Sequence, residues 1–76
     1  MKLDKALELG KKGLWQEAQV RKNPSNLNEW FVILRDTDHK PFMLVDNDDQ
    51  PLTTEDMNAL IEIIRSIHLK EFTVFL

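Results

Sequence analysis

The run of five apolar residues from Trp30 to Leu34 (WFVIL) constrains the fold of this chain more than any other segment. Aromatic and β-branched residues favour an extended strand, whose successive side chains point to opposite faces of a sheet. This strand is therefore apolar on both faces, and the segment from Phe42 to Val45 (FMLV) repeats the property. Strands of this kind are normally covered on both sides. Either two helices on opposite faces or a second subunit is expected to supply that cover.

The first third of the chain predicts a helix followed by a strand. Residues 2–9 carry apolar side chains at helical spacing, and Gly10 and Gly13 are expected to end this helix. Residues 15–22 fit either a helix or a strand. We favour the strand, because two glycines precede it and residues 23–26 (NPSN) have the composition of a turn.

A β-hairpin is predicted in the middle of the chain. Residues 29–35 and 41–46 have strand composition, and the turn-forming residues 36–40 (DTDHK) lie between them. The acidic segment 46–51 (DNDDQP) then ends the second strand. The expected conformation of this segment is a turn whose Asp and Asn side chains bond local backbone N–H groups.

A second helix and a last strand complete the pattern. Thr53 or Thr54 is expected to cap the helix, with Asp56 as a capping-box partner, and the helix is expected to end near His68. Residues 71–76 (EFTVFL) predict the final strand. The core-facing stripe of the helix is expected to contain Met57, Leu60, Ile61, Ile64 and Ile67.

These elements predict one α+β domain over residues 1–76, in the order α-β-β-β-α-β and without an internal repeat. Two helices pack on a small antiparallel or mixed sheet of three to four strands. If residues 15–22 are not a strand, the order becomes α-β-β-α-β. A chain of 76 residues buries barely enough apolar surface to offset the entropy of ordering it. Because it has no cysteine for disulfides, it needs an efficient core or self-association.

Residue types and spacings argue against an enzyme. The two serines, Ser25 and Ser66, lie in no nucleophile elbow, and no glycine-rich phosphate-binding loop is present. The acidic segment 46–51 does not match a calcium-binding loop, because a proline occupies the required glycine position. The hairpin turn holds Asp36, Asp38 and His39, which are too few ligands on too flexible a frame for a metal. No catalytic residue, metal or cofactor is expected.

A protein-interaction or assembly module is the leading hypothesis, with a homodimer as its expected form. The net charge is +3 over residues 1–35 and −6 over residues 36–76, an asymmetry that can orient a partner. The longest apolar run is far shorter than a membrane span. Absence of cysteine suits a reducing cytoplasm. The candidate interface residues are Trp15, Phe31, Ile33, Met43 and Val45.

The alternative hypothesis is a small regulator that contacts nucleic acid through residues 2–22. Lysine and arginine side chains bind phosphates, and an aromatic ring stacks on bases. The nine acidic residues in the second half weigh against this function. The candidate contacts are Lys11, Lys12, Trp15, Arg21 and Lys22.

Overall fold

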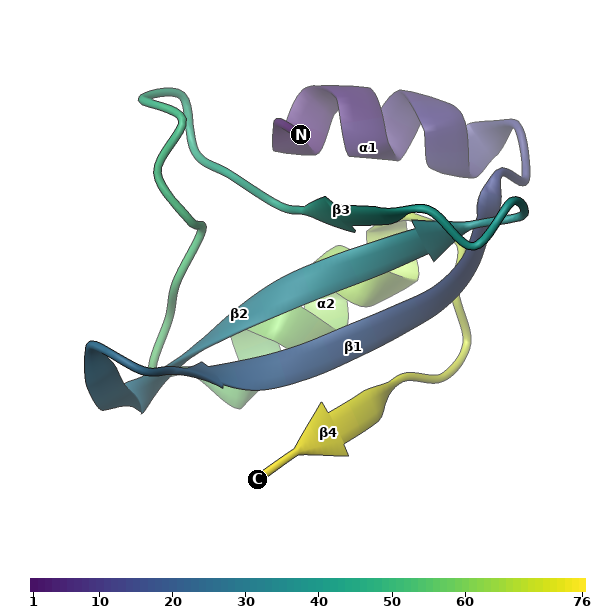
Figure 1. The fold of residues 1–76 in the computed structure, drawn as a ribbon. Coiled ribbons are helices and arrows are strands. Elements are labelled where there is room, and N and C mark those ends of the chain that lie inside the picture. Colours follow the sequence, from purple (N-terminus) through teal and green to yellow (C-terminus); the bar gives the residue numbers. More distant parts are fainter.

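Two helices and a four-stranded mixed sheet make up the fold (Figure 1). The computed structural model describes all 76 residues. The elements confirm the predicted α+β class and the order α-β-β-β-α-β. They are α1 (Leu3–Lys11), β1 (Trp15–Asn23), β2 (Asn26–Asp36), β3 (Pro41–Met43), α2 (Met57–Ser66) and β4 (Thr73–Phe75).

The strand order across the sheet is β3-β2-β1-β4. The long strands β1 and β2 pair antiparallel, and β3 adds antiparallel to β2. The strand prediction for residues 15–22 is thus confirmed, as is the hairpin formed by β2 and β3. The last strand, β4, lies parallel to β1 at the opposite edge from β3. The sequence did not predict this position, because nothing in a strand of three residues indicates which strand it pairs with.

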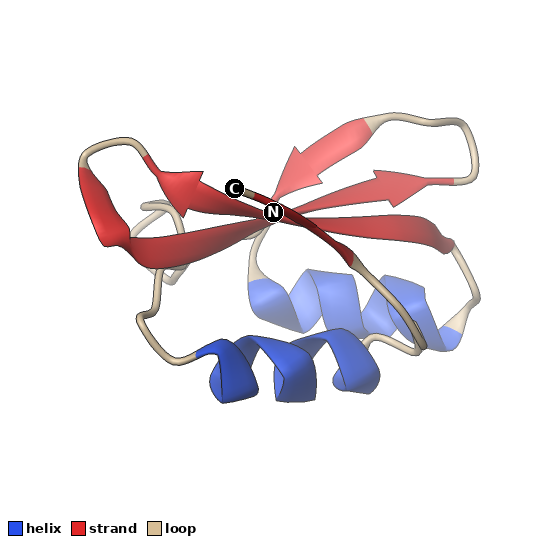
Figure 2. Ribbon diagram, turned by 90° about the horizontal axis from the view of Figure 1, so that it is seen from below, coloured by secondary structure: helices blue, strands red, loops and turns tan.

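Both helices cover the same face of the sheet (Figure 2). The core lies between the two layers, and its fully buried large side chains come from the sheet, from α2 and from the segments beside them. One of the two expected ways to cover the apolar strands, helices on opposite faces, is therefore excluded. The largest fully buried side chains are Val20, Val32, Leu34, Leu44, Leu60, Ile64 and Ile67.

Helix α1 continues through Gly10 and ends at the second glycine. Gly13 has a φ of 72°, and its N–H donates to the Gly10 carbonyl at 3.0 Å. The N–H of Leu14 donates to the Leu9 carbonyl at 3.2 Å, which completes a Schellman motif. The prediction that Gly10 helps to end the helix is wrong. Gly10 is buried inside α1, against the backbone of Ile67.

Helix α2 begins at Met57, and its cap is Asp56 rather than either of the preceding threonines. The Asp56 carboxylate accepts from the backbone N–H of Asn58 at 2.9 Å. Thr54 is held in an extended conformation by two backbone hydrogen bonds with Trp30 of β2, at 2.8 and 3.1 Å. This pairing with the sheet, which a local capping rule does not include, places the cap two residues after Thr54 and three after Thr53.

The apolar side chains of α2 face the sheet, and one of them differs from the predicted set. Leu60, Ile64 and Ile67 are buried as predicted. Ile63, which the sequence did not assign to the stripe, packs against the core cluster, whereas Ile61 does not belong to that cluster. The helix therefore presents a face rotated slightly from the expected one.

A Schellman motif also ends α2, with a histidine in the position that glycine usually occupies. His68 has a φ of 68°, and its N–H donates to the Arg65 carbonyl at 3.0 Å. The N–H of Leu69 donates to the Ile64 carbonyl at 3.3 Å. The helix ends at Ser66, two residues before the expected end. His68 thus stops α2 through its backbone conformation.

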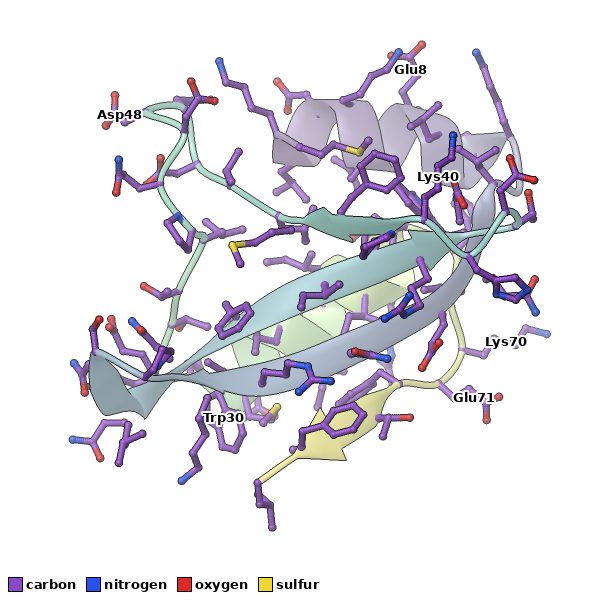
Figure 3. The ribbon with its side chains drawn as sticks, viewed as in Figure 1. Glu8, Trp30, Lys40, Asp48, Lys70 and Glu71 are labelled. Atoms are coloured by element: carbon purple, nitrogen blue, oxygen red, sulfur yellow. The ribbon has the colours of Figure 1, made fainter.

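Two five-residue loops, Asp36–Lys40 and Asp46–Gln50, share one geometry (Figure 3, where Lys40 and Asp48 are labelled). In each, the first aspartate accepts from the backbone N–H groups two and four residues later, at 2.8 to 3.1 Å. The fourth residue of each, His39 or Asp49, has a positive φ. Both loops read Asp-x-Asp-x-x-Pro in the sequence. The expected turn conformation of the acidic segment is confirmed.

Candidate interaction site on the open sheet face

The face of the sheet opposite the helices, here called the open face, carries the candidate interaction site. Its residues follow from the strand register, because paired residues lie side by side and alternate residues share a face. A middle row crosses the sheet through Thr73, Gln19, Ile33 and Met43. The row on one side of it contains Glu17, Arg35 and Pro41, and the row on the other side contains Phe75, Arg21 and Phe31.

Apolar side chains form much of the open face. Ile33 and Met43 are paired neighbours on β2 and β3, and Phe31 lies one row away. Met43 is 38% exposed and Phe75 is 37% exposed, while Phe31 and Ile33 are half-buried. These side chains extend from β3 across β2, and Phe75 adds an apolar group on the far side of β1.

A polar chain runs along β1 through the middle of this face. The Gln19 amide donates to Oε1 of Glu17 at 3.1 Å, and Nη2 of Arg21 donates to the Gln19 amide oxygen at 3.2 Å. Arg35 on β2 lies 4.0 Å from the Glu17 carboxylate. Gln19 is only 8% exposed although no helix covers it. Its neighbours on the open face therefore bury it, and the three β1 side chains hold one another in place.

Arg21 is positioned on two sides but has no carboxylate partner. Its guanidinium carbon lies 4.0 Å from the centroid of the Phe75 ring, within the range of a cation–π interaction. The ion pairs of the chain do not include it. A hollow of about 360 Å³ lies beside it and is lined by Arg21, Lys22, Pro24, Phe31, Phe75 and Leu76. The guanidinium is thus oriented next to open space, where an anionic group fits.

The structure brings three of the five candidate interface residues together on the open face: Phe31, Ile33 and Met43. Trp15 does not join them. It is 6% exposed, and its indole N–H donates to the carbonyl of Ala6 in α1 at 2.9 Å. Trp15 is a core residue of this chain and does not contribute to the open face.

Val45, the fifth interface candidate, lies beyond the end of β3. Its N–H donates to the Met1 carbonyl at 2.9 Å, and it forms bridges with Lys2 and Pro51. The residue is half-buried by these segments. Val45 therefore borders the open face without belonging to the rows defined above.

The basic candidates do not form one patch. Lys11 and Lys12 lie at the end of α1, whereas Arg21 and Lys22 lie near the far end of β1, a strand length of about 20 Å away. Arg21 and Lys22 also point to opposite faces: Arg21 lies on the open face, and the Lys22 amine is over the Trp30 ring at 5.2 Å. With Trp15 in the core, no aromatic ring joins the two basic groups.

Sequence reasoning missed the contributions of Glu17, Arg35 and Phe75 to this face. Alternate residues of a strand share a face, so Glu17 lies on the same face as Arg21, and Arg35 lies on the same face as Ile33. This alternation can be recognised in the sequence. Phe75 was different, because its place beside Arg21 depends on the pairing of β4 with β1. That pairing joins segments more than fifty residues apart and has no local signal.

Other kinds of site find little support in the structure. No three His, Asp or Glu side chains come close enough to hold a metal ion. Neither helix has the length and apolar composition needed to cross a membrane. Comparisons with protein-family models, curated proteins and solved structures give no match for this chain. The geometry of the open face is therefore the basis for the functional proposal.

Proposed function

We propose that this protein is a non-enzymatic assembly module that pairs with a second copy of itself through the open face. The observation that carries the proposal is the one-sided placement of both helices (Figure 2), which leaves Met43 and Phe75 more than a third exposed and Phe31 and Ile33 partly exposed on the other face. Contiguous apolar patches of several hundred Å² are rare on monomers and usually mark interaction sites.

The size of the chain supports a copy of itself as the occupant. A standard interface buries about 800 Å² on each partner, which is about one sixth of the 5063 Å² surface of this chain. One face of a two-layer domain supplies such an area. Small domains gain proportionally more from added apolar burial, because their own cores are marginal. Pairing thus offers the stabilisation that this cysteine-free chain does not obtain from disulfides.

Nucleic acid is the weaker candidate partner. The two basic groups are separated by the length of β1, and the carboxylate of Glu17 lies on the same face as Arg21. A titration of mixed DNA and RNA at increasing salt discriminates between the functions, because phosphate contacts give a steep salt dependence. We propose the cytoplasm as the compartment, since the absence of cysteine suits a reducing environment.

Light scattering across protein concentration tests the proposal. We expect a dimer with a dissociation constant of tens of micromolar, about −6 kcal/mol. Phe31→Ser and Met43→Ser are each expected to weaken it about tenfold or more, since each removes apolar contact from the interface. Asp48→Ser, in the exposed acidic loop, is the matched control and is expected to leave the dimer unchanged. A monomer mass for the wild-type protein at about 0.5 mM, well above that dissociation constant, would refute the proposal.

A further inference from the structure

We infer that the two copies stack with antiparallel strands about a twofold axis along the middle row of the open face, so that Glu17 of each copy meets Arg21 of the other. The inference rests on the proposed function and specifies the arrangement of the pair. It begins from the rows of the sheet, with Gln19 and Ile33 at the centre, the Glu17 row on one side and the Arg21 row on the other.

Symmetry restricts how identical sheet faces can stack. A closed homodimer has a twofold axis, and for face-to-face packing this axis lies in the plane between the sheets. Aligned sheets keep their strand directions within about 30° of each other. The axis then runs either along the strands or across them. The first choice leaves the stacked strands parallel, and the second makes them antiparallel.

An axis along β1 places like charges against each other. Every β1 residue then lies over the same residue of the second copy, so that Glu17 faces Glu17 and Arg21 faces Arg21. Like charges opposed across an interface are strongly unfavourable. An axis parallel to the strands but between β1 and β2 would instead place Glu17 over Arg35 and Arg21 over Phe31 of the second copy. The charge-swap experiment below distinguishes this arrangement, because Glu17→Arg would then oppose Arg35 and mixing the two variants would leave that repulsion in place.

An axis across the strands, along the middle row, exchanges the two flanking rows. Glu17 then faces Arg21 of the second copy, and this contact occurs twice. Arg35 faces Phe31 of the second copy, a cation–aromatic pair. In the middle row, Ile33 and Met43 each meet their own copies, while the Gln19 amide stays beneath its neighbours and keeps its hydrogen bonds with Glu17 and Arg21. The charged side chains of β1 and β2 on this face thus each meet an opposite charge or an aromatic ring.

The local geometry of Arg21 fits this role. Its Nε and Nη2 donate to the Gln19 oxygen at 3.4 and 3.2 Å, and Phe75 covers one face of the guanidinium. Nη1 donates no hydrogen bond within the chain, so one edge of the guanidinium stays free to bind a carboxylate. Packed sheets lie about 10 Å apart, a gap that the long side chains of arginine and glutamate bridge from the two sides.

A charge-swap experiment tests this arrangement. Glu17→Arg alone opposes arginine to arginine in its homodimer, and Arg21→Glu alone opposes glutamate to glutamate. Each variant is expected to dimerise at least about tenfold more weakly than the wild type. In an equimolar mixture, both contacts of the mixed dimer are again between opposite charges. Light scattering with a mass tag on one variant is expected to show a heterodimer within about threefold of wild-type affinity.

The control pair carries the same substitutions on the other side of the molecule. Glu62→Arg and Arg65→Glu alter an exposed ion pair on α2, and these variants are expected to dimerise like the wild type, alone or mixed. Thermal melting monitored by circular dichroism establishes that each variant is folded. If Arg21→Glu or Glu17→Arg unfolds the protein, Glu17→Gln and Arg21→Gln replace them, and each is expected to weaken the dimer with less disturbance.

The outcomes separate the two proposals. A wild-type dimer whose charge-reversed variants remain apart on mixing would overturn the antiparallel arrangement and leave the assembly function standing. Single variants that dimerise as tightly as the wild type would also overturn it, since the charges would then not meet. A wild-type monomer at about 0.5 mM would overturn the assembly function itself and the arrangement with it.

Discussion

Gly10 of α1 lies so close to Ile67, the residue that follows α2, that a Cβ atom added to it would be 2.5 Å from the Ile67 carbonyl oxygen. The contact joins the last turn of the first helix to the C-terminal end of the second. Because both helices share one face of a narrow sheet, they meet here backbone to backbone. The glycine therefore serves helix packing, and its place inside α1 has no role in ending that helix.

Gly10→Ala is expected to lower the free energy of unfolding by about 1–3 kcal/mol, through the backbone shift that the new methyl group forces. Alanine has the higher helix propensity, by about 1 kcal/mol, so propensity alone predicts the opposite sign. Urea unfolding measures the difference. Glu8→Ala, on the exposed side of the same helix, is the control and should change stability by less than about 0.5 kcal/mol. A stabilised Gly10→Ala protein would contradict the close approach.

His68→Gly is expected to stabilise the protein by about 0.5–1 kcal/mol. His68 adopts a φ of 68° at the end of α2, a conformation that costs free energy for any residue with a Cβ atom. Gly13→Ala, at the equivalent position after α1, is the reciprocal change. It should cost about 1 kcal/mol, because a φ of 72° is strained for alanine and no neighbouring atom crowds the new methyl group to add to that cost. Chemical denaturation of both variants tests the pair. Destabilisation by His68→Gly would mean that the imidazole makes a contact worth more than the strain.

The two matching loops are expected to differ in their importance for stability. Asp36 is 7% exposed and Asp46 is half-buried, although each accepts two backbone N–H groups. Asp36→Ala leaves two part-buried N–H groups unpaired and should cost about 2 kcal/mol, whereas Asp46→Ala should cost about 1 kcal/mol because water replaces the more exposed carboxylate. Asn at either position retains one acceptor oxygen and should recover part of the loss. Equal losses in denaturant unfolding would show that exposure does not set the cost.

Ile64→Ala is expected to cost about 2–5 kcal/mol, because Ile64 is 2% exposed at the centre of the buried face of α2. Ile61→Ala is the matched control on the same helix, since Ile61 is half-buried and outside the core cluster. Its loss should be clearly smaller. Urea midpoints at constant slope give both values. A loss below about 1 kcal/mol at Ile64 would place the core-facing side of the helix elsewhere.

Local patterns in the sequence were sufficient to predict the order of the elements. The alternation in β2, the turn residues that follow it and the apolar periodicity of α2 each depend on residues within ten positions of one another. The shared conformation of the loops Asp36–Lys40 and Asp46–Gln50 could also be predicted, since the pattern Asp-x-Asp-x-x-Pro occurs twice in the chain. Its geometry follows from the ability of an aspartate side chain to accept from the backbone N–H groups just after it.

Several features depended on contacts between distant segments and were missed for that reason. Trp15 lies between Leu14 and Gln16, an apolar and a polar residue, so its sequence context does not distinguish a core residue from a surface anchor. The carbonyl of Ala6 decides the matter by accepting its indole N–H. The charge difference between the two halves of the sequence likewise does not become a difference between two sides of the sheet, because β1 and β2 from the first half lie between β3 and β4 from the second half.

The sequence by itself determined the secondary structure, the α+β class and the presence of strands that are apolar on both faces. Backbone geometry imposes the periods of helices and strands on any chain, so these properties are visible in local residue order. Only the tertiary structure decided that α1 and α2 cover the same face and that β4 joins β1. Those choices depend on how closely separate elements can pack, as at Gly10 and Ile67, and such packing is set by pairs of residues far apart in the chain.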